Sequence, residues 1–92
     1  TPQCLPHEII GVSVNGELLT NEDARRFRTV APTTRIGYAM DGFPIYGPAP
    51  DTMTRDECGG IATSDGYRYT VDKKAGRFLS CFKGAPANFL ER

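Results

Sequence analysis

Apolar and polar positions alternate over short stretches of this chain, and turn-forming residues separate those stretches. Residues 8–14 are mostly apolar and β-branched, which is typical of a strand, and Asn15-Gly16 follows directly. This dipeptide is a strong hairpin signal because both positions tolerate positive φ. We therefore expect a strand over 8–14, a tight turn, and a partner strand over 17–19.

A short helix is expected after this hairpin. Thr20 can cap a helix, and Asp23 stands three residues later, as in a capping box. The segment 21–27 can be helical, and the helix must end before Pro32.

The next expected strand covers 33–40. Strict alternation places Ile36, Tyr38 and Met40 on one face and residues 35, 37, 39 and 41 on the other. Asp41-Gly42 is a second turn signal.

Further strands are expected over 43–46, 66–71 and 78–82. Pro44 restricts the first of them to a sheet edge or a bulge. In the second, Tyr67 and Tyr69 share one face. Segments 47–55 and 59–65 are expected to be loops, and Phe89-Leu90 of the tail to pack on the core. The pattern predicts a mainly β fold, a small β-rich α+β domain of short antiparallel strands and hairpins with one short helix.

The composition sets the size of the core. The chain has 92 residues, 10 glycines, 7 prolines and no tryptophan. This length predicts one small domain over 1–92, with a core too small to be very stable alone. Such a domain gains from a disulfide or from an oligomeric partner.

The charge balance excludes some classes of partner. Eleven basic and eleven acidic residues give zero net charge, so we expect no nucleic-acid or membrane-surface binding. We expect a protein partner or a homo-oligomer instead. The chain begins with Thr1 rather than Met, and removal of a secretory signal is the simplest interpretation. A trimmed product or a fragment is the alternative.

Three cysteines leave several arrangements open. Cys4, Cys58 and Cys81 allow one disulfide in three possible pairings, with one cysteine left over. Free thiols in a cytosolic protein are an alternative. A zinc site is disfavoured because no C-x2-C or C-x2-H spacing occurs.

Four blocks of sequence resemble one protein family. They are 37–48 (GYAMDGFPIYGP), 56–60 (DECGG), 66–71 (GYRYTV) and 81–84 (CFKG). In this order they resemble the YHYH-domain family, which is named for a Tyr-His-Tyr-His strand. Here that strand reads Tyr67-Arg68-Tyr69-Thr70, so both tyrosines remain and both histidines are replaced.

The resemblance implies an exported, β-rich domain with a Cys58–Cys81 disulfide, because both cysteines match family positions. Such a bridge closes a loop of about 24 residues and contributes about 3 kcal/mol in the chain-entropy model. The family is also associated with metal binding. Arg68 and Thr70 are poor metal ligands and His7 is the only histidine, so we expect a degenerate motif without metal or cofactor.

The acidic residues of the blocks have two interpretations. Asp41, Asp56 and Glu57 could bind a hard cation such as calcium, although no EF-hand spacing supports this. We favour structural roles for them in turns and ion pairs. Arg68, opposite the tyrosines on its strand, is expected to hold one of these three carboxylates.

The aromatic residues can likewise line a binding site or fill a core. We favour the core for the set as a whole, which consists of Tyr38, Phe43, Tyr46, Tyr67 and Tyr69. If a ligand site exists, its candidate residues are Asp41, Tyr46, Asp56, Glu57, Tyr67, Arg68 and Tyr69.

The sequence identifies no catalytic residues. A G-x-S-x-G motif is absent, and His7 is the only candidate base for a triad. The expected function is a non-catalytic binding or structural module, secreted to an extracellular or periplasmic space. The alternative is a metal-binding or enzymatic domain that works together with a second chain.

Overall fold

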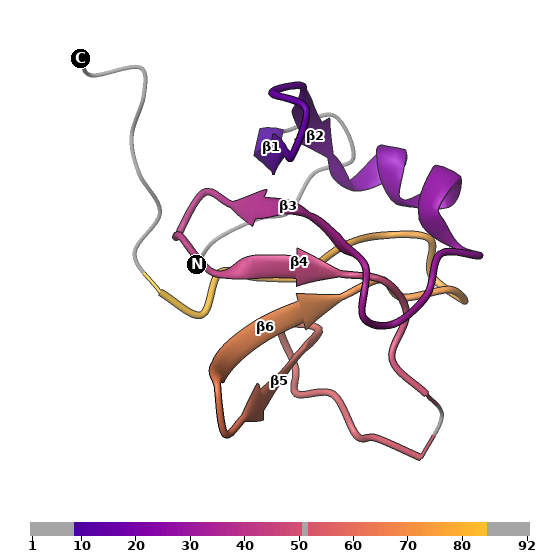
Figure 1. The fold of residues 1–92 in the computed structure, drawn as a ribbon, viewed down its shortest axis with the longest axis vertical. Helices are drawn as coiled ribbons and strands as arrows, with labels where there is room; N and C mark the ends of the chain where they lie inside the picture. Colours follow the sequence, from indigo (N-terminus) through magenta and orange to yellow (C-terminus); the bar gives the residue numbers. More distant parts are fainter. Residues whose placement is uncertain (1–8, 51, 85–92) are drawn as a thin grey trace.

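A computed structural model describes residues 9–50 and 52–84 and shows a six-stranded mixed sheet with one short helix (Figure 1). The strands lie in the order β2-β1-β3-β4-β6-β5, and only the β4–β6 pair is parallel. The elements are β1 (Ile9–Ser13), β2 (Leu18–Thr20), the 3-10 helix η1 (Asn21–Phe27), β3 (Arg35–Ala39), β4 (Pro44–Tyr46), β5 (Gly60–Thr63) and β6 (Gly66–Thr70). The predicted fold class is confirmed.

The first hairpin forms as predicted, although with a different turn. Ser13 donates its N–H to the carbonyl of Glu17 at 2.7 Å, which closes a three-residue loop. Gly16 has a φ of 89°, whereas no non-glycine residue among those described has a positive φ. Of the two turn residues, only Gly16 has the left-handed conformation. The predicted turn would have required it for Asn15 as well.

The helix begins where the sequence predicts. The Asp23 carboxylate accepts hydrogen bonds from the backbone N–H of Thr20 at 2.8 Å and from its hydroxyl at 3.2 Å. Buried Asn21 then accepts the N–H groups of Phe78 and Leu79 at 2.8 and 3.0 Å. This side chain fixes the last described segment of the chain to the start of η1.

The predicted faces of β3 are wrong. The pairing with β4 shifts register between Arg35 and Gly37, which interrupts the alternation. Ile36 is consequently buried at 3% exposure, while Tyr38 is 44% exposed on the other side of the sheet. Tyr38 therefore shares its face with Arg35.

Of the two positions expected for β4, a sheet edge or a bulge, the edge is wrong, because this strand lies between β3 and β6. Its pairing with β3 does contain a register shift, on the β3 side. Pro44 is accommodated because it is the first residue of the strand. The ladder with β6 starts at Ile45, so no N–H is needed from Pro44 there.

Two further predictions fail near the C-terminal part. Segment 59–65, expected to be a loop, contains the edge strand β5. Segment 78–82, expected to be a strand, is irregular and runs across one face of the sheet (Figure 1). Phe78 and Leu79 are nevertheless fully buried, since an apolar run can fill a core without pairing as a strand.

The sheet has an inner and an outer face. On the inner face, Ile45 lies opposite Tyr69 in the ladder, and both are completely buried. On the outer face, Tyr46 lies opposite Thr70. The core beneath the inner face contains Ile10, Leu19, Ala24, Ile36, Ala39, Ile45, Cys58, Tyr69, Val71, Phe78 and Leu79.

Some expectations concern residues outside the described ranges. These are Cys4, His7 and the packing of Phe89-Leu90. Within the described ranges, no helix is long and apolar enough to cross a membrane.

Candidate functional site

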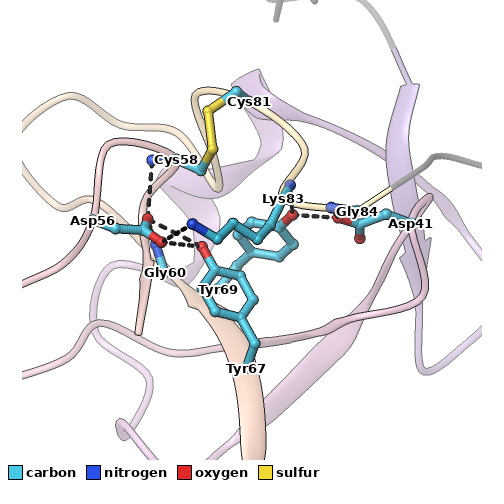
Figure 2. A network of polar contacts seen from close by, with 9 residues as sticks. All are labelled: Asp41, Asp56, Cys58, Gly60, Tyr67, Tyr69, Cys81, Lys83 and Gly84. Atoms are coloured by element: carbon cyan, nitrogen blue, oxygen red, sulfur yellow. Dashed lines mark hydrogen bonds and ion pairs between the residues drawn. A yellow bond between two sulfur atoms is a disulfide. The ribbon is translucent and has the colours of Figure 1, made fainter. Parts of the chain in front are cut away.

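The four blocks that carry the family resemblance meet in one place (Figure 2). Asp41 comes from the turn after β3, Asp56 from the loop before β5, Tyr67 and Tyr69 from β6, and Lys83 from the last described segment. We call these five residues the tyrosine–aspartate cluster.

Asp56 organises one half of the cluster. Its carboxylate accepts the N–H groups of Cys58 at 2.9 Å and Gly60 at 3.1 Å, and the hydroxyl of Tyr67 at 2.8 Å. The Lys83 ammonium lies 3.7 Å from the same carboxylate. Asp56 thus fixes the path of the chain from the loop into β5.

These contacts shift the ionisation of both partners. Partial burial alone would raise the pKa of Asp56, but hydrogen bonds from Gly60, Tyr67 and Cys58 lower it below its ordinary value. Burial and the Asp56 carboxylate together raise the pKa of Tyr67 well above its ordinary value of 10.0. The carboxylate therefore stays ionised and the phenol stays neutral at neutral pH.

Asp41 and Tyr69 form the other half. The Tyr69 hydroxyl donates to Asp41 and accepts the backbone N–H of Lys83 at 2.8 Å. Asp41 also accepts the N–H groups of Gly84 at 3.1 Å and Phe43 at 3.3 Å. Burial of Tyr69, followed by its bond to Asp41, raises the pKa of this phenol well above 10.0, although the Lys83 N–H opposes the rise.

The aromatic rings join the two halves. Tyr67 and Tyr69 pack edge to face with ring centres 5.2 Å apart, and Phe43 lies 5.0 Å from Tyr67 and 6.3 Å from Tyr69. Gly60 is required beneath them, because a methyl group at this position would overlap the Tyr67 hydroxyl. The cluster is therefore closely packed as well as hydrogen-bonded.

A disulfide lies beside the tyrosine–aspartate cluster (Figure 2). Cys58 and Cys81 are bridged, as the resemblance implied, and the bridge links the Asp56 loop to the segment that carries Lys83. A disulfide between these residues indicates a non-reducing compartment.

The tyrosine–aspartate cluster has little capacity for acid–base chemistry. Both carboxylates are occupied by N–H and O–H donors, and the pKa of each phenol is far above neutral pH. Among the residues that the structure describes, no group of three or more His, Cys, Asp or Glu could hold a metal ion. The cluster stabilises the fold.

A second polar group lies on the outer face of the sheet. The Arg68 guanidinium stacks over the Tyr46 ring with its carbon 4.7 Å from the ring centre. Arg35 approaches the same ring at 5.7 Å and donates to the hydroxyls of Tyr38 at 2.6 Å and Tyr46 at 3.2 Å. We call these four residues the arginine–tyrosine face.

The predicted ion pair of Arg68 with Asp41, Asp56 or Glu57 is therefore wrong. Asp41 and Asp56 are turned toward the tyrosines of the inner face, whereas Arg68 lies on the opposite side of β6. Its charge lies instead over the Tyr46 ring.

Within the described ranges, no carboxylate compensates the positive charge of the two arginines on the outer face. In the described part of the chain, ion pairs connect Arg26 with Asp23, Arg55 with Asp72 and Lys83 with Asp56. Neither Arg35 nor Arg68 has a carboxylate partner within these ranges. The outer face is thus cationic although the whole chain is neutral.

A polar cavity of about 400 Å³ adjoins the tyrosine–aspartate cluster. It is lined by residues from 48–50, 53–59 and 71–80, among them the predicted site residue Glu57 and the exposed lysines Lys73 and Lys74. The ion pair between Arg55 and Asp72, 3.4 Å long, is part of the wall.

The seven candidate ligand residues are therefore divided among three places. Asp41, Asp56, Tyr67 and Tyr69 lie in the inner cluster, Tyr46 and Arg68 lie on the outer face, and Glu57 lies at the cavity.

Sequence reasoning did not single out Lys83, Gly84 or Arg35. The first two stand in the CFKG block, which was a usable signal, whereas nothing local marks Arg35. Tyr38 and Tyr46 were assigned to the core with the other aromatic residues, and this was wrong for both. Tyr38 is 44% exposed, and Tyr46 is only partly buried and lies on the outer face.

No protein-family model matches the chain, and comparisons with curated proteins and with solved structures gave no match.

Proposed function

We propose that this chain is a non-catalytic binding module and that the arginine–tyrosine face is its binding surface. One observation carries the proposal. The carboxylates and phenols of the inner cluster are occupied in holding the fold, whereas Arg35 and Arg68 have no carboxylate partner in the described ranges. Guanidinium groups that have no carboxylate partner keep a charge that a partner of opposite charge can engage.

We also propose that the chain is a divergent relative of the YHYH-domain family. The meeting of all four blocks in a single cluster supports this relationship (Figure 2). Both family tyrosines, Tyr67 and Tyr69, have a structural role there that does not need the missing histidines. Arg68 replaces the first histidine on the outer face, where the proposed binding takes place.

Export from the cell is part of the proposal. The Cys58–Cys81 disulfide supports it, since such bridges persist in oxidising compartments. A partner would then be another exported protein or a second copy of this chain. The alternative function, a metal-binding or enzymatic domain completed by a second chain, has no specific observation in its favour and stays a prediction.

A panel of ligand classes tests the proposal. Immobilised peptides, oligosaccharides and anionic vesicles would be probed with the wild-type chain and with the double variant Arg35→Gln/Arg68→Gln. The matched control is Lys73→Gln/Lys74→Gln, which removes the same charge from the wall of the cavity. We expect at least one class to bind the wild type and the control but not the arginine variant.

Two results would overturn the proposal. Binding that is lost only in the lysine control would place the site in the cavity. Absence of binding to every class would remove the basis for a binding module.

A further inference from the structure

The outer face combines the two arginines with an exposed apolar row. Leu18 lies opposite Val12 in the ladder of β2 and β1, and Val12 lies opposite Tyr38 in the ladder of β1 and β3. Directly opposed residues point to the same side of a sheet. Leu18 is 57% and Tyr38 44% exposed, and Val12 between them is partly buried, so the accessible apolar area lies mainly on β2 and β3.

The apolar row continues directly into the cationic group. Arg35 donates to the Tyr38 hydroxyl, and it lies opposite Tyr46 in the β3–β4 ladder. Arg68 reaches the same Tyr46 ring from β6. A ligand that crosses the strands therefore meets apolar side chains first and two guanidinium groups next.

The two guanidinium groups are close enough to be engaged together. Their carbons lie 5.7 and 4.7 Å from the same ring centre, so their separation cannot exceed those two distances combined. Side chains two residues apart on an extended peptide are about 7 Å apart and point to the same side. Two acidic residues in such an arrangement match the two guanidinium groups.

The surroundings favour a peptide over a polyanion. A nucleic-acid base that stacked on Tyr46 would compete with the two guanidinium groups, whose carbons lie 5.7 and 4.7 Å from its ring centre. A sulfated sugar or a phosphate backbone would leave the row of Leu18, Val12 and Tyr38 uncovered. The neutral charge of the whole chain likewise gives no long-range attraction for a polyanion.

We propose that the arginine–tyrosine face and its apolar row bind an extended acidic segment of another protein, in which two carboxylates stand beside apolar residues. This inference rests on the proposed function and specifies its ligand. The carboxylates would take bidentate hydrogen bonds from Arg35 and Arg68, and the apolar residues would cover Leu18 and Tyr38.

Selection from a phage-displayed library of random peptides tests the inference. The oxidised wild-type chain is the bait, and the double variant Arg35→Gln/Arg68→Gln is the counter-bait. We expect enriched peptides to contain at least two Asp or Glu residues together with aliphatic or aromatic ones. Replacing both acidic residues of an enriched peptide by Asn or Gln should weaken binding by at least about tenfold.

Amide chemical shifts then locate the contact. Titration with an enriched peptide should shift resonances of β1, β3, β4 and β6 around the outer face, and added salt should weaken binding. Leu18→Ser, which changes an exposed apolar residue and no charge, should weaken it less than the arginine variant does. The Lys73→Gln/Lys74→Gln chain, equally reduced in charge, should bind as the wild type does.

Several results would overturn this inference while leaving the proposed function intact. One is enrichment of neutral or basic peptides that still require the two arginines. Another is tighter arginine-dependent binding of a single-stranded oligonucleotide, a sulfated oligosaccharide or an anionic vesicle than of any acidic peptide. If acidic peptides bind the arginine variant as well as the wild type, the outer face is not the site and both proposals fail.

Discussion

The two faces of the sheet use tyrosine in opposite ways. On the inner face, Tyr67 and Tyr69 donate to carboxylates, and Tyr69 is completely buried while Tyr67 is partly buried. On the outer face, Tyr38 and Tyr46 accept from the guanidinium of Arg35 and remain partly open to solvent. The same residue type therefore stabilises the fold on one face and presents charged groups on the other.

The two pairs of tyrosines differ because of the groups that they contact, which are carboxylates on the inner face and guanidinium groups on the outer face. A carboxylate beside a buried phenol completes a hydrogen-bonded unit, which has no capacity left for a ligand. A guanidinium beside an exposed ring keeps most of its N–H donors and its full charge available. A cluster whose polar groups are all hydrogen-bonded within the fold is therefore structural, whereas a surface whose polar groups keep free donors is a candidate binding surface.

Removal of the disulfide should have the largest effect on stability. The double variant Cys58→Ser/Cys81→Ser is expected to lose about 3 kcal/mol, because the unfolded chain regains the freedom of the closed loop. For a domain of this size the melting temperature should fall by about 12–24 °C. Scanning calorimetry of the variant against the oxidised wild type measures this, and a shift below about 5 °C would contradict it.

Neutralising one carboxylate of the inner cluster should come next. The Asp56 carboxylate accepts hydrogen bonds from two N–H groups and one hydroxyl, whereas the amide of Asp56→Asn has a single acceptor oxygen. The substitution also removes the ion pair with Lys83. We expect a loss of about 1–3 kcal/mol in urea unfolding. Glu57→Gln, the neighbouring exposed residue, is the control and should unfold as the wild type does.

The inner cluster should also make stability depend on pH at both extremes. The pKa of Tyr67 and of Tyr69 is raised in the folded chain, so their stabilisation is complete below pH 10 and is lost as the pH rises above it. The pKa of Asp56 is lowered, so its stabilisation is present above its ordinary value of 3.8 and is lost at lower pH. Urea unfolding between about pH 9 and pH 11 tests the alkaline part.

A matched variant assigns the alkaline loss. Tyr67→Phe/Tyr69→Phe cannot ionise at these positions, so its unfolding free energy should fall less steeply with rising pH than that of the wild type. An equal slope in both chains would assign the alkaline loss to other groups.

Changes on the outer face should have the smallest effect on stability. Arg68→Gln removes a partly exposed contact with the Tyr46 ring, and we expect a loss of about 0.5–1 kcal/mol in the same unfolding assay. A loss as large as that of Asp56→Asn would mean that Arg68 belongs to the structural framework, and the contrast between the two faces would disappear.

Local patterns predicted the first hairpin, the extent of η1, the alternation of β6 and the β-rich class, because each depends on residues close in sequence. The register shift in β3 could not be predicted, since it depends on pairing with β4 and reverses the side on which Tyr38 lies. Segment 78–82 was misassigned because Asn21, distant in sequence, takes the backbone donors of Phe78 and Leu79.

The same limit applies to the site. The resemblance implied the Cys58–Cys81 disulfide correctly, but the sequence did not show that tyrosines and backbone N–H groups would saturate Asp41 and Asp56. Hydrogen bonds between residues 11, 28 and 43 positions apart leave no local pattern. Which charges lack a carboxylate partner depends on the same long-range contacts, so the sequence alone does not identify Arg35 and Arg68 as unpaired within the described ranges.

The most direct test removes one hydroxyl from each face. Tyr69→Phe and Tyr46→Phe make the same chemical change on β6 and β4, which are adjacent strands, and their unfolding free energies would be measured together in urea. Tyr69→Phe should cost about 1–3 kcal/mol, because Asp41 and the Lys83 N–H lose a buried partner. Tyr46→Phe should change stability by less than about 0.5 kcal/mol, since its exposed bond to Arg35 is replaced by water. Equal losses, or a larger loss for Tyr46→Phe, would contradict the account.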